Sequence, residues 1–119
     1  MIKFNILDSN ESQRIFFKYP EMLEYEVDYS IIIDGKTFFY EPNFPVLEFI
    51  YQVKEWKNSQ PDSFEYNSLE TDDNPLITFK YNNGLFSISS PWQKFQCDNK
   101  YTKDELVAAL SKITTIYTN

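Results

Sequence analysis

The residue types that most often carry catalysis are scarce in this chain. The 119-residue sequence contains no histidine, so no imidazole can act as a general base or a metal ligand. Cys97 is its one cysteine, and a reactive thiol needs a neighbouring base or a helix N-terminus. Nucleophilic catalysis and structural zinc depend on such groups, so we expect no catalytic residues, no cofactor and no metal site.

Carboxylates are the remaining groups that could do chemistry, and three of them lie along one predicted strand. Glu24, Glu26 and Asp28 take alternate positions, so their side chains share one face of the strand, about 7 Å apart. One interpretation is an edge strand that carries charge to prevent pairing with other sheets. The other is a negative stripe that docks a basic protein.

A second acidic cluster, formed by Glu70, Asp72 and Asp73, falls in a predicted loop. Its pattern lacks the glycine and the closing glutamate that an EF-hand calcium loop requires. A solvated loop and a patch that attracts a basic partner are both consistent with it. Trp92, which follows Ser90 and Pro91, is either packed or an exposed anchor of the kind found at binding hot spots.

The composition favours a protein partner over a nucleic acid. The formal net charge is −7, whereas binding to phosphates by counterion release needs clustered Lys and Arg. Aromatic residues make up 18% of the chain; most should pack in a core, and Tyr and Trp also suit binding surfaces. The negative charge has two explanations, which are solubility and the attraction of a basic partner such as a nuclease surface.

Targeting signals are absent from the sequence. No segment approaches the ~20 apolar residues of a membrane span, so we expect no membrane partner. The N-terminus lacks the apolar run of a secretory signal, and one cysteine allows no intrachain disulfide. These features predict a cytoplasmic location.

Two dipeptides, Asp34-Gly35 and Asn83-Gly84, each separate two runs of strand-forming residues. This arrangement is typical of a two-residue hairpin loop in which glycine supplies a positive φ. Residues 23–33 alternate apolar and polar side chains, so one face of that strand should lie in the core. The loops set these pairs: Ile33 with Lys36, Ile31 with Phe38, Tyr29 with Tyr40, Tyr81 with Phe86 and Phe79 with Ile88.

Two amphipathic helices are also predicted. After Pro45, apolar side chains recur every three or four residues as far as Trp56, which places Trp56 in the core and Glu48 elsewhere on the helix surface. Thr102 followed by Glu105 forms a capping box at the start of the second helix. Each helix should therefore cover a sheet with one face.

The predicted order of elements is strands, helix, strands, helix. Besides the hairpins, strands are expected at residues 2–7 and 64–69, and a further extended segment at residues 92–97. We therefore expect a single α+β domain over residues 1–119. It should have a mainly antiparallel sheet of roughly five to seven strands, with both helices packed on one face.

Several stretches of the chain together resemble a type of small bacterial protein. They are Ile31-Ile32-Ile33-Asp34-Gly35-Lys36, Leu47-Glu48-Phe49, Trp56, Ser89-Ser90-Pro91-Trp92 and Thr102-Lys103-Asp104-Glu105-Leu106. In size, acidity and order of elements the chain is similar to the α+β immunity proteins that bacteria encode beside polymorphic or contact-dependent toxins. The resemblance implies a cytoplasmic protein that binds one toxin domain and blocks its active site.

The function expected from these features is that of a protein-binding module without enzymatic activity. The acids named above would steer a basic partner such as a toxin domain, and Trp92 would anchor it. Two alternatives stay open. One is a regulatory or structural subunit that forms homo-oligomers through an exposed strand edge. The other is an enzyme that uses carboxylates or Tyr.

Overall fold

Two antiparallel sheets and two helices make up the described part of the chain. The computed structural model describes residues 1–7, 25–59 and 62–115. The first sheet has the strand order β1-β2-β3 and the second the order β4-β5-β6. In chain order the elements are β1 (Ile2–Leu7), β2 (Val27–Ile33), β3 (Lys36–Phe44), α1 (Val46–Lys57), β4 (Phe64–Tyr66), β5 (Ile77–Asn82), β6 (Leu85–Ser89) and α2 (Lys103–Thr114).

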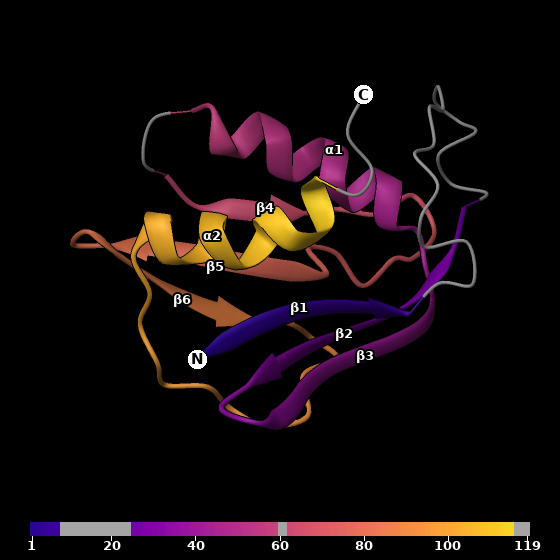
Figure 1. Ribbon diagram of the computed structural model, residues 1–119, viewed down its shortest axis with the longest axis horizontal. Helices are drawn as coiled ribbons and strands as arrows, with labels where there is room; N and C mark the ends of the chain where they lie inside the picture. Colours follow the sequence, from indigo (N-terminus) through magenta and orange to yellow (C-terminus); the bar gives the residue numbers. More distant parts are fainter. Residues whose placement is uncertain (8–24, 60–61, 116–119) are drawn as a thin grey trace.

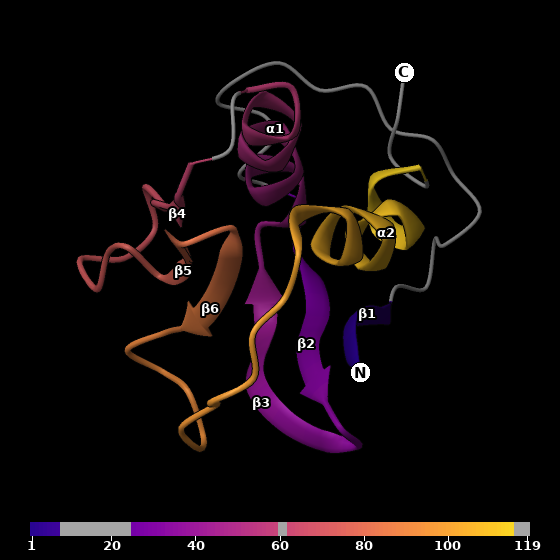
Figure 2. The same cartoon turned by 90° about the vertical axis from the view of Figure 1, so that its left-hand side faces the viewer.

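The sheets stand at an angle to each other, and both helices lie across the open side between them (Figures 1 and 2). The α+β class is confirmed, but the expected single sheet is wrong. The segment after β6 bonds to the outer edges of β3 and β6, so these two strands do not pair with each other. Lys94 donates its backbone N–H to the carbonyl of Phe38 in β3, at 2.8 Å. Tyr101 exchanges backbone hydrogen bonds of 2.7 and 2.9 Å with Phe86 in β6.

Aromatic side chains join the sheets and helices into one core. Phe4 of β1 meets Phe79 of β5 with ring centroids 6.0 Å apart, so the two sheets touch directly. Trp56 of α1 is buried, as predicted, and its ring lies 5.6 Å from that of Phe79. Its indole N–H donates to the carbonyl of Asp62, which satisfies the polar atom of a side chain that is otherwise packed.

The first hairpin keeps its predicted turn but not its predicted register. Ile33 pairs with Lys36 as expected, whereas Ile31 pairs with Phe39 because a β-bulge lies between Ile31 and Ile32. One extra residue in β3 reverses the alternation beyond it. As a result Phe38 and Phe39 are both buried, and Tyr40, expected in the core opposite Tyr29, pairs with Ser30 and is 45% exposed.

The second hairpin and the start of α2 match their predictions. The pairs Tyr81–Phe86 and Phe79–Ile88 are both present. Gly35 and Gly84 have φ values of 82° and 86°, as two-residue loops of this kind require. The capping box of α2 is complete, because Thr102 and Glu105 each accept a hydrogen bond from the other's backbone N–H.

Two further predictions are corrected by the structure. Residues 92–97 form turns, bends and irregular structure and no strand. A single backbone hydrogen bond, from Lys94 to Phe38, joins them to β3, which is too few for a strand ladder. The edge-strand interpretation of the acids near β2 is also wrong, since β2 lies in the centre of its sheet. Neither described helix is long and apolar enough to cross a membrane.

Candidate functional site

Three carboxylates from distant parts of the chain meet at one small cavity, which we call the acidic hollow. Its volume is about 190 Å³. Glu26 precedes β2, Glu41 lies in β3, and Glu70 belongs to the loop between β4 and β5. The other lining residues that the structure describes are polar or apolar, and none of these is Lys or Arg: Asn43, Phe44, Pro45, Ser68, Thr71, Leu76 and Trp92.

The electrostatic environment of Glu70 is unfavourable for its charge. Partial burial raises the pKa of its carboxyl group above the usual value, and the negative charges of Glu26 and Glu48 raise it further. Among the described residues, the one ion pair joins Met1 and Asp34, so no described lysine forms an ion pair with the carboxylates of the hollow. A cation brought by another molecule would relieve this repulsion.

Trp92 forms one wall of the acidic hollow and is held by contacts on two sides. Its ring stacks on Phe39 at 6.2 Å, and its indole N–H donates to Asp73 at 2.8 Å. The Ser90 hydroxyl accepts the Trp92 backbone N–H at 3.0 Å. The side chain is half-buried, so Trp92 is both a packed residue and part of the rim of the hollow.

The predicted binding residues do not all gather here. Glu26, Glu70 and Trp92 line the hollow, and Asp73 contacts it through Trp92. Asp72 is exposed in the same loop. Asp28 does not line the hollow. Its carboxylate accepts a hydrogen bond from the Tyr40 phenol at 3.2 Å, and this bond raises the pKa of that phenol. Glu24 lies outside the described residues.

Sequence reasoning missed a buried carboxylate next to this region. Glu48 was expected on the surface of its helix, yet its side chain is 1% exposed. One of its oxygens accepts the Tyr66 phenol at 2.7 Å, and the other accepts the Leu69 backbone N–H at 3.1 Å. These partners lie 18 and 21 residues away in the sequence, so no local pattern could have revealed them.

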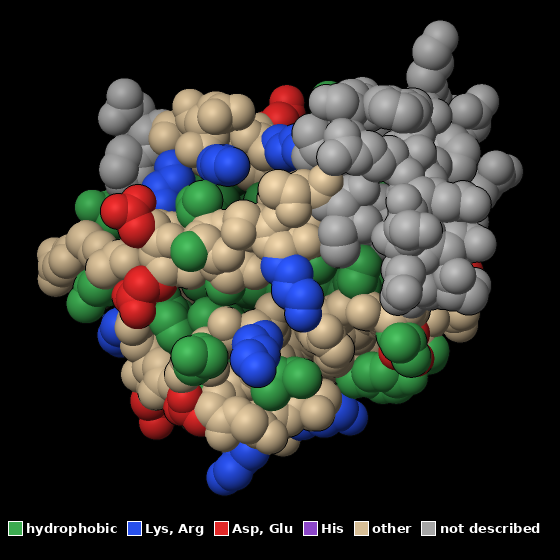
Figure 3. All heavy atoms as spheres, in the orientation of Figure 1, with side chains coloured by type: hydrophobic (Ala, Val, Ile, Leu, Met, Phe, Trp, Pro, Cys, Tyr) green, Lys and Arg blue, Asp and Glu red, His purple; other side chains and the backbone are tan. Residues whose placement is uncertain are grey.

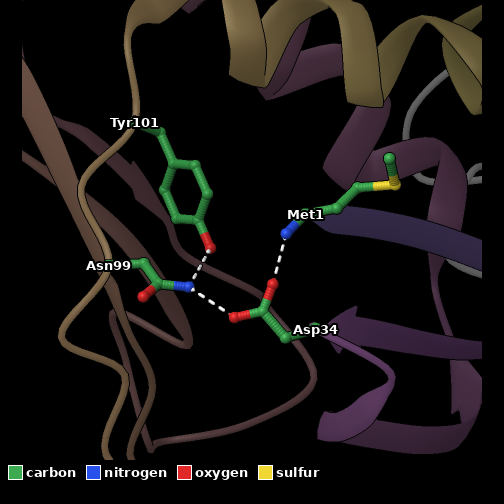
Figure 4. A network of polar contacts seen from close by, with 4 residues as sticks. All are labelled: Met1, Asp34, Asn99 and Tyr101. Atoms are coloured by element: carbon green, nitrogen blue, oxygen red, sulfur yellow. Dashed lines mark hydrogen bonds and ion pairs between the residues drawn. The ribbon is translucent and has the colours of Figure 1, made fainter.

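A separate polar network ties the first strand to the segment before α2. Figure 4 shows the Met1 ammonium group on one oxygen of Asp34 and the Asn99 amide between Asp34 and Tyr101. Hydrogen bonds from these donors, with the ammonium charge, hold the pKa of the Asp34 carboxyl below its usual value. Each group already has its partner within the network, so the arrangement joins elements of the fold.

Charged side chains of both signs lie on the face that carries α2, where Lys and acidic groups are spread among apolar and neutral ones (Figure 3). Among the described residues that line the acidic hollow, none is Lys or Arg. Within residues 1–7, 25–59 and 62–115, no group of three or more Cys, Asp or Glu side chains could hold a metal ion.

Comparison with known proteins places the chain in a family. Residues 2–116 match the model of a family described as Domain of unknown function (DUF7878). No curated protein and no solved structure matches the chain. Because the match extends over nearly all of the sequence, the chain belongs to the DUF7878 family.

Proposed function

We propose that this protein is a binding module that receives a cationic side chain of a basic protein partner in the acidic hollow. The observation that carries the proposal is the meeting of Glu26, Glu41 and Glu70 beside the Trp92 ring, in a lining whose described residues include no Lys. The module holds its partner through shape and negative potential, and it performs no covalent chemistry.

The dimensions of the hollow support a side chain as its occupant. Its volume of about 190 Å³ is below the ~300–1,000 Å³ typical of pockets for drug-sized ligands. A Lys or Arg side chain can place its alkyl stem against the half-buried Trp92 and its charge among the carboxylates. Stacking on the Trp92 ring would add a cation–π contribution of about 0.5–1 kcal/mol.

The specific form that we propose is a cytoplasmic immunity protein that neutralises a cognate bacterial toxin domain. The resemblance described above supports it, together with the net charge of −7. A toxin that acts on nucleic acid has a basic active-site surface, and an acidic module can cover that surface. Electrostatic attraction would speed the encounter, which suits an inhibitor that must act before its toxin does.

A charge-reversal experiment tests the proposal. The purified protein is mixed with the toxin-like domain encoded by the adjacent gene, and association is measured with the wild type, Glu70→Lys and Asp98→Lys. Glu70→Lys should weaken binding by roughly tenfold or more. Asp98→Lys changes the net charge equally at an exposed position outside the hollow, so binding should change little.

The same experiment has two results that count against the proposal. Equal affinities of the wild type and Glu70→Lys would remove the hollow as the binding site. If the protein bound no basic domain and sedimented as a dimer, the homo-oligomeric alternative would replace the binding module.

A further inference from the structure

A second, larger depression lies between α1 and β4, and we call it the α1–β4 groove. Its volume is about 900 Å³. Figure 1 shows α1 directly above β4, and the chain after β4 separates this groove from the acidic hollow. Its lining residues are Glu48, Tyr51, Gln52, Glu55, Trp56, Ser59, Asp62, Ser63, Phe64, Glu65, Asn67 and Leu69.

The groove runs along the open edge of the second sheet. In the two-residue hairpin, Asn82 and Leu85 form the hydrogen-bonded pair next to the loop, so Thr78 and Lys80 also bond to β6. Alternation then directs the backbone groups of Ile77 and Phe79 toward β4, where they pair with Tyr66 and Phe64. The N–H and C=O of Glu65 therefore point away from β5, toward the groove.

One end of this edge is already paired, by a side chain of α1. The Gln52 amide donates to the Asn67 carbonyl at 2.8 Å and accepts the Asn67 N–H at 3.1 Å. Gln52 thus provides both hydrogen bonds that a neighbouring strand would provide. At Glu65, the Asn67 side chain donates a long hydrogen bond of 3.5 Å from its Nδ2 to the carbonyl oxygen. Because this bond is weak, Glu65 is the edge residue at which another backbone can pair.

The side chains around this open position are apolar and acidic. Leu69 is 77% exposed and Tyr51 is 44% exposed, and both line the groove. Glu55, Asp62 and Glu65 carry negative charge, and no Lys or Arg is among the described residues of the lining. Lys103 reaches one end of the groove, where its ammonium group donates to the carbonyls of Trp56 and Ser59 at 3.2 and 2.9 Å. The charge, the exposed apolar surface and the open backbone groups together select the chemistry of an occupant.

We propose that the α1–β4 groove binds an extended, basic segment of the protein partner, which adds to β4 at Glu65. The inference rests on the proposed function and specifies a second point of contact and its geometry. The segment exchanges two backbone hydrogen bonds with Glu65, as in strand addition to a sheet edge. Its Lys and Arg side chains face the acids, and its apolar side chains cover Tyr51 and Leu69.

The contact should be weak when it is isolated from the rest of the partner. Gln52 blocks the edge at Asn67, so only a short stretch of backbone can pair. We therefore expect a dissociation constant of roughly 0.1–1 mM for a free peptide, near the weak end of protein interactions. Joined to a partner that also fills the acidic hollow, the segment would bind at a much higher effective concentration.

A synthetic peptide tests the groove directly. The probe is Lys-Val-Arg-Val-Lys-Val-Arg, titrated into the full chain while backbone amide shifts are followed by NMR. The expected result is a saturable shift of the Glu65 amide and of its neighbours in β4 and α1. A peptide N-methylated at every residue, which has no backbone N–H to donate to the edge, should bind at least about tenfold more weakly.

Variants separate this inference from the proposed function. Glu65→Lys should weaken peptide binding by roughly tenfold, whereas Glu70→Lys, in the acidic hollow, should change it less than twofold. Shifts confined to the hollow, no saturable shift, or equal binding of the N-methylated peptide would overturn the inference. If Glu70→Lys weakens binding of the whole partner and Glu65→Lys does not, the proposed function stands and the groove is not used.

Discussion

Replacing Tyr66 with Phe should destabilise the protein more than any other removal of a single hydroxyl described above. The Tyr66 phenol donates to Glu48 at 2.7 Å, and both side chains are at most 1% exposed. Tyr66→Phe keeps the packed ring and takes from the buried carboxylate one of its two hydrogen bonds. The remaining charge then has only the Leu69 N–H to stabilise it.

The magnitude follows from the charge on the acceptor. Hydrogen bonds to charged groups contribute about 1.5–3 kcal/mol, and no water can replace the lost donor at a fully buried site. The unfolding entropy of a chain of 119 residues is about 250 cal/mol/K. Each kcal/mol therefore lowers Tm by about 4 °C, so Tyr66→Phe should lower Tm by about 6–12 °C.

Thermal and urea denaturation of four variants would check this value. Tyr81→Phe is the matched control, because Tyr81 is 37% exposed and its hydroxyl lies at the surface. Glu48→Leu and the Glu48→Leu/Tyr66→Phe double variant complete a double-mutant cycle. Without the carboxylate, the Tyr66 hydroxyl keeps only the Ser68 side chain as a hydrogen-bond partner, so the same substitution should cost much less.

The reasoning would be refuted by a loss below about 0.5 kcal/mol for Tyr66→Phe. It would also be refuted if the substitution cost the same free energy with and without Glu48. Either result would mean that the buried carboxylate draws its stability from other groups.

Three further predictions concern the charge, the phenols and the second hairpin. Glu70→Gln should raise the free energy of unfolding by roughly 0.5 kcal/mol or less after solvent screening, because it removes a partly desolvated charge and its repulsion with Glu26; an unchanged or lower stability at low salt would contradict this. Burial raises the pKa of the Tyr29 and Tyr66 phenols, so in the folded protein they stay protonated where the unfolded chain ionises, near pH 10. Stability should be complete below that pH and fall above it by about 1.4 kcal/mol per pH unit for each phenol, and absorbance titration should show both ionising only on unfolding. Gly84→Ala should cost about 1 kcal/mol, because φ is 86° and no atom lies within 4 Å of an added Cβ, so only backbone strain contributes; denaturation with Gly84→Asn as the milder control would measure it.

The hairpin around Asn83-Gly84 was predictable to the level of residue pairs, because turn type and side-chain alternation agree over its whole length. The hairpin around Asp34-Gly35 was predictable only next to the turn. Its bulge places Phe38 and Phe39 side by side in the core, and adjacent aromatic residues give no sign of which one leaves the alternation.

The sequence was enough to predict that acids and a tryptophan form the candidate site, but not to predict every residue that lines it. The sequence indicated Glu26, Glu70 and Trp92, which do meet, because charge clusters and an interrupted strand are local features. It could not indicate Glu41, which reaches the hollow through the folding of β3. It also could not show that two sheets form, since that depends on which edges residues 90–101 cover in space.

The amide of Gln52 has a consequence for self-association. An uncovered sheet edge invites identical molecules to stack through their backbones, which is a common origin of fibrils. By pairing with Asn67, Gln52 leaves a single residue of the β4 edge open to another backbone. One residue is too few for two copies of the protein to form a stable strand pair. The β4 edge thus gives identical molecules little backbone on which to stack, while Glu65 leaves one short position for the foreign strand proposed above.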